Sequence, residues 1–497
     1  MKRILIIGWA DIRKASREGG GYNLVALHHA HALAAEGCSV YYLQSGRHYG
    51  LSWLWGRKPS PFILPLRRWH AIRRYALFNS SQRAPEKYNF HSEKSLEDLD
   101  QSRIVARWVK RKAIDEVYIH SLEGSSLSLP RLLKQIPKVK LVIFCHDHYY
   151  LCPQIQLLYR GKSACTDYLD GSRCYSCRDH TPAGLFEKRR ARRMLGWEHL
   201  YPLAVSLLAL LGIKWKKRES LSPCDPPIPF PPETAVPTNE LFLSLLSAPR
   251  GENFYACRRT AAITALQHAD LVLSPSSFIA ETLKHAGLSS DRLKVVKLGL
   301  PHLDALKVAA QRLQENDSCN MPTKGERPLV FSYRGSGMEH KGLPFLVEAL
   351  AQLPNDISAR IHVIIRGIDP VLYAGTKWLR LAETLPYIEI HPPYTVQELY
   401  GFVHEYDIGF HPHLWFENSP VALLEHIAAG KPVVAADLGG VKDYITEGEN
   451  GWLYPAGNQE ALISLISRIV RGEILIPRVS PHTISSFEDF LHSIGGL

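Results

Sequence analysis

Short apolar strands alternate with helices along most of the chain, and this alternation limits the possible folds more than any other feature. Residues 3–8 (RILIIG) are typical of a buried strand, residues 24–37 (LVALHHAHALAAEG) of a helix, and residues 38–44 (CSVYYLQ) of a second strand. A helix between two strands is the usual crossover of a parallel pair. Repeated units of this kind therefore predict a doubly wound α/β sheet.

The pattern divides into two regions, each long enough for its own sheet. In the first region, strands are predicted at 116–121 (EVYIHS), 140–147 (KLVIFCHD) and 269–276 (ADLVLSPS). After the polar segment 311–327, a second series begins with PLVFSYRGSG. We therefore expect a lobe at 1–310 with an irregular insert at 181–251, a lobe at 327–475, and a C-terminal tail at 476–497 that packs back on the first lobe.

The chain is basic, and its basic residues cluster beside apolar ones. It has 59 Lys and Arg against 48 Asp and Glu, a net charge of +11, which suggests an acidic partner. Within the insert, basic clusters flank an apolar stretch of 14 residues (200–213), too short to span a bilayer. Such a segment fits either an anionic membrane surface or a helix packed on the protein body. Trp and Arg residues at 53–58 and 66–75 favour the membrane surface, and no nucleic-acid recognition motif is present.

The cysteine pattern and the N-terminus bear on the compartment. The first apolar run is too short for a signal peptide and fits a strand better, so the cytoplasm is the default location. Nine cysteines then favour free thiols or a metal site over disulfides. Cys152, Cys165, Cys174 and Cys177 lie within 26 residues and include a C-x2-C pair. They could form a structural zinc site, with His180 as an alternative ligand, or remain reduced thiols in a loop.

Two segments of the second region carry charged residues in apolar surroundings. YRGSGMEHKG (333–342) predicts a strand that turns into a helix, with Lys341 at the helix start, where a lysine can bind phosphate. FENSPVALLEHIAAG (416–430) predicts a helix over 421–429 with Ser419 as N-cap. Glu417 precedes this helix and Glu425 lies within its apolar residues. Either both glutamates are solvated surface charges, or Glu425 faces a cavity or a ligand.

The two segments together predict a site for a diphosphate joined to hydroxyl-bearing groups. Both segments are expected at the carboxyl edge of one sheet, where open α/β sheets bind ligands. Two helix N-termini and Lys341 could hold the diphosphate, and the glutamates could accept hydrogen bonds from hydroxyls.

These motifs resemble those of the retaining glycosyltransferases of family 4, which have the two-lobed GT-B fold. The marks are Glu417 and Glu425 as E-x7-E, AAGKPVVAADLGGVKDYITEGENGWLYPAGN (428–458) and HKGLPFLVEALAQLP (340–354). The glycine loop and helix GGGYNLVALHHAHALAAEGCSV (19–40), FCHDHYYLCP (144–153) and ADLVLSPSSFIAETL (269–283) agree with the first lobe of that family. The resemblance covers most of 1–165 and 255–460 but leaves the insert unexplained.

The resemblance assigns roles to residues of the second lobe. Glu425 is expected to bind the ribose hydroxyls of the donor nucleotide, Glu417 the donor sugar, and Lys341 the leaving diphosphate. Backbone N–H groups near Asn418 and Ser419 are expected to add to diphosphate binding.

Residues of the first lobe and of the glycine-rich turn complete the expected site. The resemblance places Gly20 and Gly21 near the diphosphate or acceptor and His146 near the donor sugar. Gly335 lies in the turn that approaches the phosphates. The family often has an arginine where this chain has Ser336, and Arg334 lies nearby on the strand side.

The resemblance implies transfer with retention of configuration and without a metal. The acceptor hydroxyl is expected to attack from the front face while the diphosphate accepts its proton, so charge stabilisation on that diphosphate dominates catalysis. The expected partners are a UDP- or GDP-linked sugar and a glycan or lipid-linked acceptor of cell-surface polysaccharide synthesis, at the inner face of the plasma membrane. The alternatives are a nucleotide-sugar-binding subunit without turnover and a soluble transferase for a small metabolite.

Overall fold

The computed structural model describes most of both predicted lobes. The described residues are 1–15, 20–48, 60–82, 84, 96–152, 154–160, 163–165, 171, 173–174, 177, 238–245, 252–316 and 327–495. The predicted insert at 181–251 lies outside them except for 238–245, and the aromatic segment 53–58 lies outside them entirely. Among the described helices, none combines the length and hydropathy that a bilayer span requires.

The first lobe is built on an eight-stranded sheet in the order β10-β9-β6-β5-β1-β2-β4-β3. All neighbouring strands are parallel except β3, which runs antiparallel to β4 at the edge. The strands are β1 (Arg3–Gly8), β2 (Ser39–His48), β3 (Phe62–Pro65), β4 (Arg73–Phe78), β5 (Glu116–Ile119), β6 (Lys140–Phe144), β9 (Leu271–Ser274) and β10 (Leu293–Val295). A separate small ribbon joins β7 (Leu158–Tyr159) and β8 (Ser163–Ala164).

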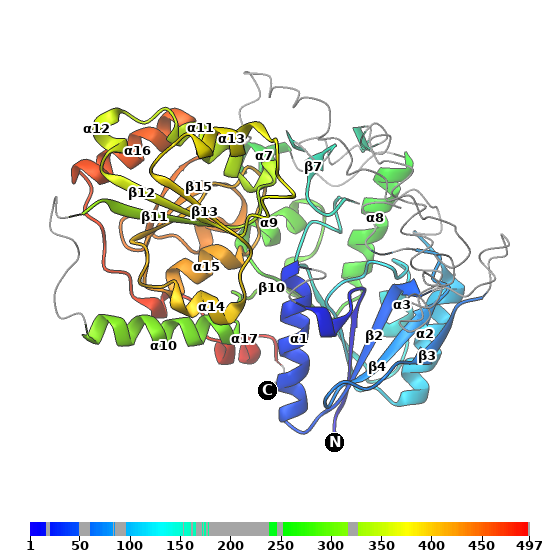
Figure 1. Ribbon diagram of the computed structural model, residues 1–497. Helices are drawn as coiled ribbons and strands as arrows, with labels where there is room; N and C mark the ends of the chain where they lie inside the picture. Colours follow the sequence, from blue (N-terminus) through cyan, green and yellow to red (C-terminus); the bar gives the residue numbers. More distant parts are fainter. Residues whose placement is uncertain are drawn as a thin grey trace, which may run out of the picture.

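Helices cover both faces of this sheet because alternate strand residues are apolar on both sides. In β1, Ile4 and Ile6 pack on the side of α1, whereas Leu5 and Ile7 pack on the side of α2, α3 and α8. The helices of this region are α1 (Gly20–Ala35), α2 (Leu99–Lys112), α3 (Leu129–Lys134), α7 (Asn239–Leu245), α8 (Phe254–Gln267), α9 (Ser277–His285) and α10 (Pro301–Asn316), with short 3-10 turns η1 (Ile12–Lys14) and η5 (Ser290–Arg292). Figure 1 shows α1 at the side of this lobe that faces the second one.

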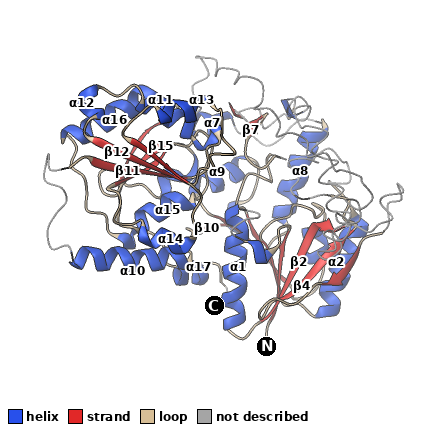
Figure 2. Ribbon diagram, in the orientation of Figure 1, coloured by secondary structure: helices blue, strands red, loops and turns tan. Residues whose placement is uncertain are grey.

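The second lobe has a six-stranded, fully parallel sheet in the order β13-β12-β11-β14-β15-β16. Its strands are β11 (Leu329–Arg334), β12 (Ile361–Arg366), β13 (Ile388–His391), β14 (Ile408–His411), β15 (Val433–Asp437) and β16 (Gly451–Pro455). Its helices are α11 (Leu343–Leu350), α12 (Asn355–Ser358), α13 (Lys377–Glu383), α14 (Val396–Gly401), α15 (Val421–Ala428) and α16 (Gln459–Arg471), with η6 (Glu339–Lys341) and η7 (Gly439–Asp443). Figure 2 shows the strands between two helical layers. Two doubly wound lobes facing each other confirm the predicted GT-B architecture.

The strand order places a ligand-binding edge between β11 and β14. From β11 the chain moves outward through β12 and β13 and then returns to the other side of β11 as β14. Loops that leave two such strands diverge at their carboxyl ends, and the crevice between them is the usual ligand position in open α/β sheets. Arg334 ends β11, and the segment that carries Glu417 follows β14.

An apolar cluster and several hydrogen bonds join the lobes. The cluster extends from the α1 side of the first sheet to α10, α14 and α15, with α10 packed directly on α15.

The predicted boundary at residue 310 falls within α10. After η8 (Pro481–Thr483), α17 (Phe487–Ser493) returns to first-lobe elements: Lys294 Nζ donates to Ser493 O (2.7 Å), and the rings of His28 and Phe487 lie 5.9 Å apart.

Gly342 offers a test of the turn that follows Lys341. Its φ is +76°, and an added Cβ would lie 1.7 Å from the Pro412 carbonyl oxygen. Gly342→Ala should lower the free energy of unfolding by at least ~1 kcal/mol, since strained backbone of this kind costs about 1–3 kcal/mol. Denaturant unfolding measures the change.

Gly401→Ala is the matched control for that substitution. Gly401 ends α14, has no neighbouring heavy atom within 4 Å of an added Cβ, and does not have a positive φ. Alanine there should leave stability unchanged or raise it, because alanine favours helix over glycine. Equal losses in both variants would contradict the structural role of Gly342.

Candidate active site

The buried Glu417 and the partly exposed Lys341 form an ion pair at the edge between β11 and β14. Lys341 Nζ donates to Glu417 Oε1 at 2.5 Å, and Trp415 Nε1 donates to the same oxygen at 2.9 Å. The lysine ammonium also lies 4.7 Å from the centre of the Trp415 ring, within cation–π range. Lys341 and Glu417 are 76 residues apart, yet the sheet brings their loops together as the sequence analysis expected.

Neighbouring charges determine the charge state of Glu417. Burial is the largest single influence and acts to raise the pKa of this carboxyl group, but Lys341, His411 and His413 together outweigh it and lower the pKa from its ordinary 4.5 to about 2. Glu417 is therefore ionised throughout the physiological pH range. A carboxylate held by two donors can still accept hydrogen bonds from ligand hydroxyls through its remaining lone pairs.

Glu425 is also buried, on the inner face of α15. Its side chain approaches His302 Nε2 (3.3 Å) through Oε1 and Arg334 Nη1 (4.0 Å) through Oε2. The exposed fractions of Glu417 and Glu425 are 7% and 9%. The alternative that both are solvated surface charges is therefore wrong.

Arg334 lies inside the second lobe, close to Glu425. Its guanidinium donates to Tyr406 Oη (3.0 Å) and to His426 Nδ1 (2.7 Å), and its side chain is 1% exposed. The next residue, Gly335, has a positive φ of 159° at the extended limit, and Tyr333 Oη donates to the Ser336 carbonyl oxygen (2.8 Å). The observed contacts of Arg334 thus position the Glu425 carboxylate, and donor binding by Arg334, Gly335 and Ser336 stays a prediction.

Ser419 does not cap α15 as predicted. The helix begins at Val421, Pro420 occupies the N-cap position, and no side chain caps it. Ser419 Oγ instead lies 2.8 Å from Tyr444 Oη, which also approaches the Pro275 carbonyl oxygen at 2.9 Å. The single hydroxyl proton of Tyr444 is donated to the Pro275 carbonyl oxygen, so Ser419 Oγ donates to Tyr444 Oη. The Ser419 hydroxyl is therefore bound to Tyr444 instead of capping the helix.

Asn418 and the glycine loop bring first-lobe residues to the same place. Asn418 Nδ2 donates to the His146 carbonyl oxygen (2.9 Å), so His146 lies beside the second lobe. Gly20 and Gly21 open α1, and an added Cβ at Gly21 would lie 4.0 Å from Val421 at the start of α15. Two positive helix ends thus meet across the lobes, which is the arrangement expected around a diphosphate.

Several residues of this site were not identified from the sequence. Trp415, His302 and Tyr444 contact predicted residues, and His29 of α1 reaches His146 through His120, which the sequence already places in the predicted strand 116–121. Trp415 could have been found from its position two residues before Glu417. The others come from distant segments, and no local pattern marks them.

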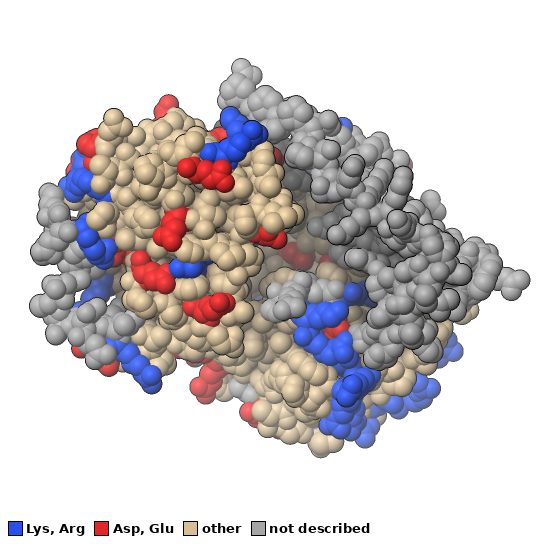
Figure 3. Space-filling view, viewed as in Figure 1, with Lys and Arg blue, Asp and Glu red and all other residues tan. Residues whose placement is uncertain are grey.

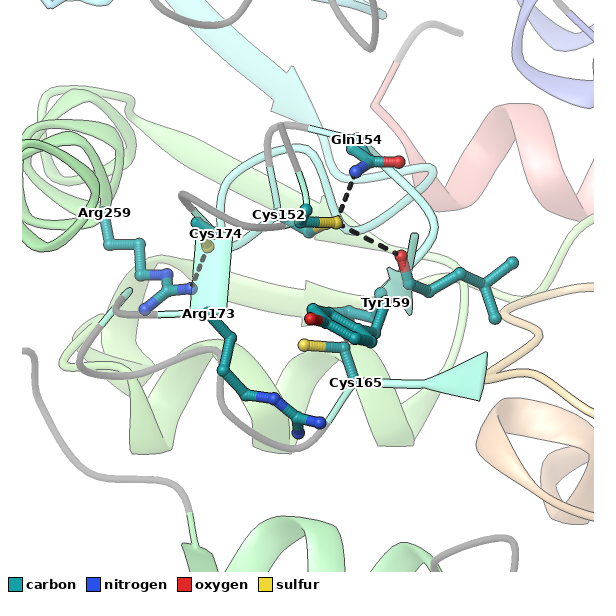
Figure 4. A pocket seen from close by; sticks show the side chains of 10 residues that line it. Cys152, Gln154, Tyr159, Cys165, Arg173, Cys174 and Arg259 are labelled. Atoms are coloured by element: carbon teal, nitrogen blue, oxygen red, sulfur yellow. Dashed lines mark hydrogen bonds between the residues drawn. The ribbon is translucent and has the colours of Figure 1, made fainter. Parts of the chain in front are cut away.

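The four cysteines of the predicted zinc site line one cavity of about 20 Å³. Figure 4 shows Cys152, Cys165 and Cys174 around it, with Arg259 Nη2 donating to Cys174 Sγ (3.3 Å). Burial raises the pKa of Cys152, and it raises the pKa of Cys177 to about 11. Within the described ranges, however, no three His, Cys, Asp or Glu side chains are arranged to hold a metal ion. The geometry therefore gives zinc no support, zinc stays a prediction, and His180 lies outside the described residues.

Comparison with known proteins finds a family match for the second lobe. Residues 316–481 match the family described as glycosyl transferases group 1. This match spans the whole of the second lobe. Over 82 residues the chain is 35% identical to the amylovoran biosynthesis glycosyltransferase AmsK of Erwinia amylovora, covering 16% of this chain and 20% of AmsK. The chain spans about a fifth to a half of the length of the curated relatives that it matches.

Solved structures match over nearly the whole chain. HepE of Anabaena in complex with UDP superposes with a TM-score of 0.53 at 15% identity, covering 97% of this chain and 93% of HepE. The lipopolysaccharide outer core galactosyltransferase WaaB gives 0.54 at 14% identity, covering 99% and 98%. At these identities the likeness establishes the GT-B fold.

The low pKa of Glu417 predicts how its ion pair contributes to stability. A carboxyl group whose pKa is depressed on folding stabilises the protein above its unfolded pKa and loses that contribution as pH falls towards the folded value. Glu417→Gln should therefore lower the melting temperature most at pH 6–8. The difference from wild type should shrink between pH ~5 and ~2, because protonation then removes the charge in wild type too.

Glu383→Gln is the control for that experiment. Glu383 is an exposed glutamate at the end of α13 in the same lobe. Its substitution should leave melting temperature nearly unchanged across the series. A Glu417→Gln deficit that is constant from neutral pH to pH 3 would argue against the ion pair as its source.

Proposed function

We propose that the chain is a retaining glycosyltransferase that moves a sugar from a nucleoside-diphosphate sugar to a glycan or lipid-linked acceptor in cell-surface polysaccharide synthesis. The observation that carries the proposal is the pair of buried glutamates, with Lys341 bound to Glu417, in a segment that matches the glycosyl transferases group 1 family. Buried carboxylates are costly unless they bind partners, and both are placed to accept hydrogen bonds from sugar and ribose hydroxyls.

Each charged group has a definite task in this proposal. Glu425, held by His302 and Arg334, accepts hydrogen bonds from the ribose hydroxyls. Glu417 accepts a hydrogen bond from the donor sugar, and Lys341 Nζ neutralises charge on the diphosphate as it leaves. In this proposal Glu417 binds the donor sugar through a carboxylate that Lys341 and Trp415 hold in place, and it is not assigned the role of a nucleophile.

The transfer itself needs no covalent enzyme intermediate. The bond between the anomeric carbon and the diphosphate oxygen breaks while the acceptor oxygen bonds to that carbon on the same face. The acceptor proton passes to the departing diphosphate oxygen. Catalysis then depends on stabilising negative charge at the diphosphate, through Lys341 and the facing N-termini of α1 and α15. No metal or other cofactor takes part in the proposed reaction.

Relatives support the class of donor and product. HepE is described in complex with UDP and with UDP-glucose, and a trehalose-6-phosphate structure from E. coli is described as bound to UDP-2-fluoro glucose. AmsK is named for amylovoran biosynthesis and WaaB for the lipopolysaccharide outer core. A UDP- or GDP-sugar and a surface-polysaccharide acceptor follow as the first partners to test. A subunit without turnover, or a transferase for a small metabolite, remains the alternative hypothesis.

Nucleotide-dependent stabilisation tests the proposal directly. The melting temperature of the purified full chain would be measured with UDP, GDP, ADP and NAD in turn. At ~100 times its Kd, one nucleoside diphosphate should stabilise the folded state by about 2.7 kcal/mol. Glu425→Gln should abolish the shift because it removes the charged acceptor for ribose, whereas the exposed Glu383→Gln should keep it.

Release of the nucleotide from the matching sugar then separates the enzyme from the subunit. A shift with one nucleotide but no turnover of any of its sugars, with or without lipid-linked acceptors, would favour the subunit. No shift with any of the four ligands would contradict the donor site.

We also propose that the first lobe lies against an anionic membrane surface. Helix α2 exposes Arg103, Arg107, Lys110 and Arg111, and Figure 3 shows Lys and Arg gathered on this lobe. A basic face of this kind would bring the protein to a lipid-linked acceptor. The predicted insert, which suggested the same partner, lies outside the described residues.

Vesicle binding tests the basic face. Arg107→Gln/Arg111→Gln should weaken sedimentation with phosphatidylserine-containing vesicles by ~2 kcal/mol, from about 1 kcal/mol per basic residue. The control is Arg468→Gln/Arg471→Gln on α16, which removes the same charge from an exposed part of the second lobe. Equal loss in both variants would show a general charge effect instead of a specific face.

A further inference from the structure

Three histidines, two of them buried, form a hydrogen-bonded chain that ends at the proposed donor site. His29 lies on α1, His120 directly follows β5, and His146 follows β6. His29 Nδ1 and His120 Nε2 are 3.1 Å apart, and His120 Nδ1 and His146 Nε2 are also 3.1 Å apart. His29 and His120 are at most 2% exposed, so the chain leads from the core of the first lobe to its edge.

Aromatic packing fixes the planes of these rings. The Phe144 ring stacks on His120 at 4.2 Å and on His146 at 5.1 Å, with interplanar angles of 16° and 2°. The rings of His120 and His146 are themselves 18° from parallel, with centres 5.2 Å apart. Together with the short nitrogen–nitrogen distance, these values describe two nearly coplanar rings joined edge to edge. His146 therefore cannot turn without losing both its stacking and its hydrogen bond.

All three rings are neutral at physiological pH. Burial lowers the pKa of His29 and of His146 to about 3 and lowers the pKa of His120 well below its ordinary value. A neutral imidazole carries one N–H and one lone pair. Three rings thus have three protons, and each of the two inter-ring bonds uses one. The third proton must be at one end of the chain, on His29 Nε2 or on His146 Nδ1.

The buried end of the chain determines where this proton lies. Among the described residues, nothing is within hydrogen-bond distance of His29 Nε2. In folded backbones, a buried N–H without an acceptor is rarer than a buried acceptor without a donor. We apply the same preference to His29, so its Nε2 carries a lone pair and its proton is on Nδ1. His29 then donates to His120, and His120 donates to His146. The remaining proton is on His146 Nδ1, the ring nitrogen left for a ligand.

We propose that His29 and His120 are positioning residues that fix the tautomer and ring plane of His146, so that His146 Nδ1–H is a hydrogen-bond donor to an oxygen of the bound nucleotide sugar. The ligand part of this inference rests on the proposed function; the tautomer does not. A fixed donor selects an acceptor oxygen of the sugar or diphosphate and needs no change of charge as the ligand binds. His146 touches the ligand, and the other two histidines act through it.

Two amide substitutions of His120 separate the two bonds of the chain. The asparagine amide reaches the position of histidine Nδ1, so His120→Asn keeps a partner for His146 Nε2. The glutamine amide reaches the position of Nε2, so His120→Gln keeps the partner for His29 and loses that for His146. Both substitutions are polar, isolate one bond each, and remove the same stacking against Phe144.

Histidine NMR of the ligand-free protein provides the first measurement. Long-range ¹H–¹⁵N spectra distinguish protonated from bare ring nitrogens, and His146→Gln identifies the His146 signals. We expect His146 to be neutral with its proton on Nδ1 in wild type and in His120→Asn. In His120→Gln, the His146 signals should show a mixture of tautomers. A wild-type His146 protonated on Nε2, or identical His146 spectra in the two amide variants, would overturn the proposal.

Affinity for the nucleotide sugar found by thermal stabilisation provides the second measurement. Loss of one oriented hydrogen bond should weaken binding about tenfold in His120→Gln, with most of the affinity restored in His120→Asn. Equal weakening in both variants would show that His120 serves only to fill space. The spectra are recorded without ligand, so they test the tautomer of His146 even when no nucleotide sugar binds. If a nucleotide binds but His146 carries its proton on Nε2, the positioning role is wrong and the proposed function still stands.

Discussion

Residues 416–418 hold the two lobes and the proposed site in one arrangement, through two backbone oxygens and the Asn418 side chain. The Phe416 carbonyl oxygen lies 3.0 Å from His148 Nε2 of the first lobe, the Glu417 oxygen accepts from Gly440 N (2.7 Å), and Asn418 bonds to His146. Gly439 and Gly440 follow β15 where added Cβ atoms would lie 2.2 Å from the oxygens of Glu417 and Asn418. A buried carboxylate can be aimed at a ligand here because the backbone that carries it is held from both sides.

The ion pair of Glu417 and Lys341 follows from the same constraint. A carboxylate with 7% exposure is costly without a charged partner, and the loop after β11 supplies one in Lys341. Gly342, in the left-handed region directly after Lys341, lets this loop pass the Pro412 backbone closely enough to reach Glu417. Gly342, Gly439 and Gly440 allow the close backbone contacts that bring the two charged residues together. A variant that kept both charges but replaced these glycines would therefore not preserve the site.

The sequence predicted the elements whose signals are local. The buried strands of both sheets, the glycine-opened helix α1 and the placement of Glu417, Glu425 and Lys341 at one sheet edge are confirmed, because strand periodicity and parallel topology determine them. Features that depend on distant partners were missed or wrong. Ser419 was predicted to cap α15, but Tyr444 takes its hydroxyl, and the chain from His29 to His146 joins three elements separated by up to 117 residues.

The ion pair also bears on how the proposed site would accept a diphosphate. Without a ligand, Lys341 neutralises Glu417, so the buried carboxylate is not left without a charged partner. When a diphosphate binds, it offers Lys341 a stronger anion, while sugar hydroxyls and Trp415 Nε1 can satisfy Glu417. The cost of separating the pair is then offset only by a ligand that brings both phosphate and hydroxyl groups. Under the proposed function, a nucleoside diphosphate without its sugar would satisfy Lys341 but leave Glu417 less well paired, so the ion pair would favour the intact nucleotide sugar over the product nucleotide.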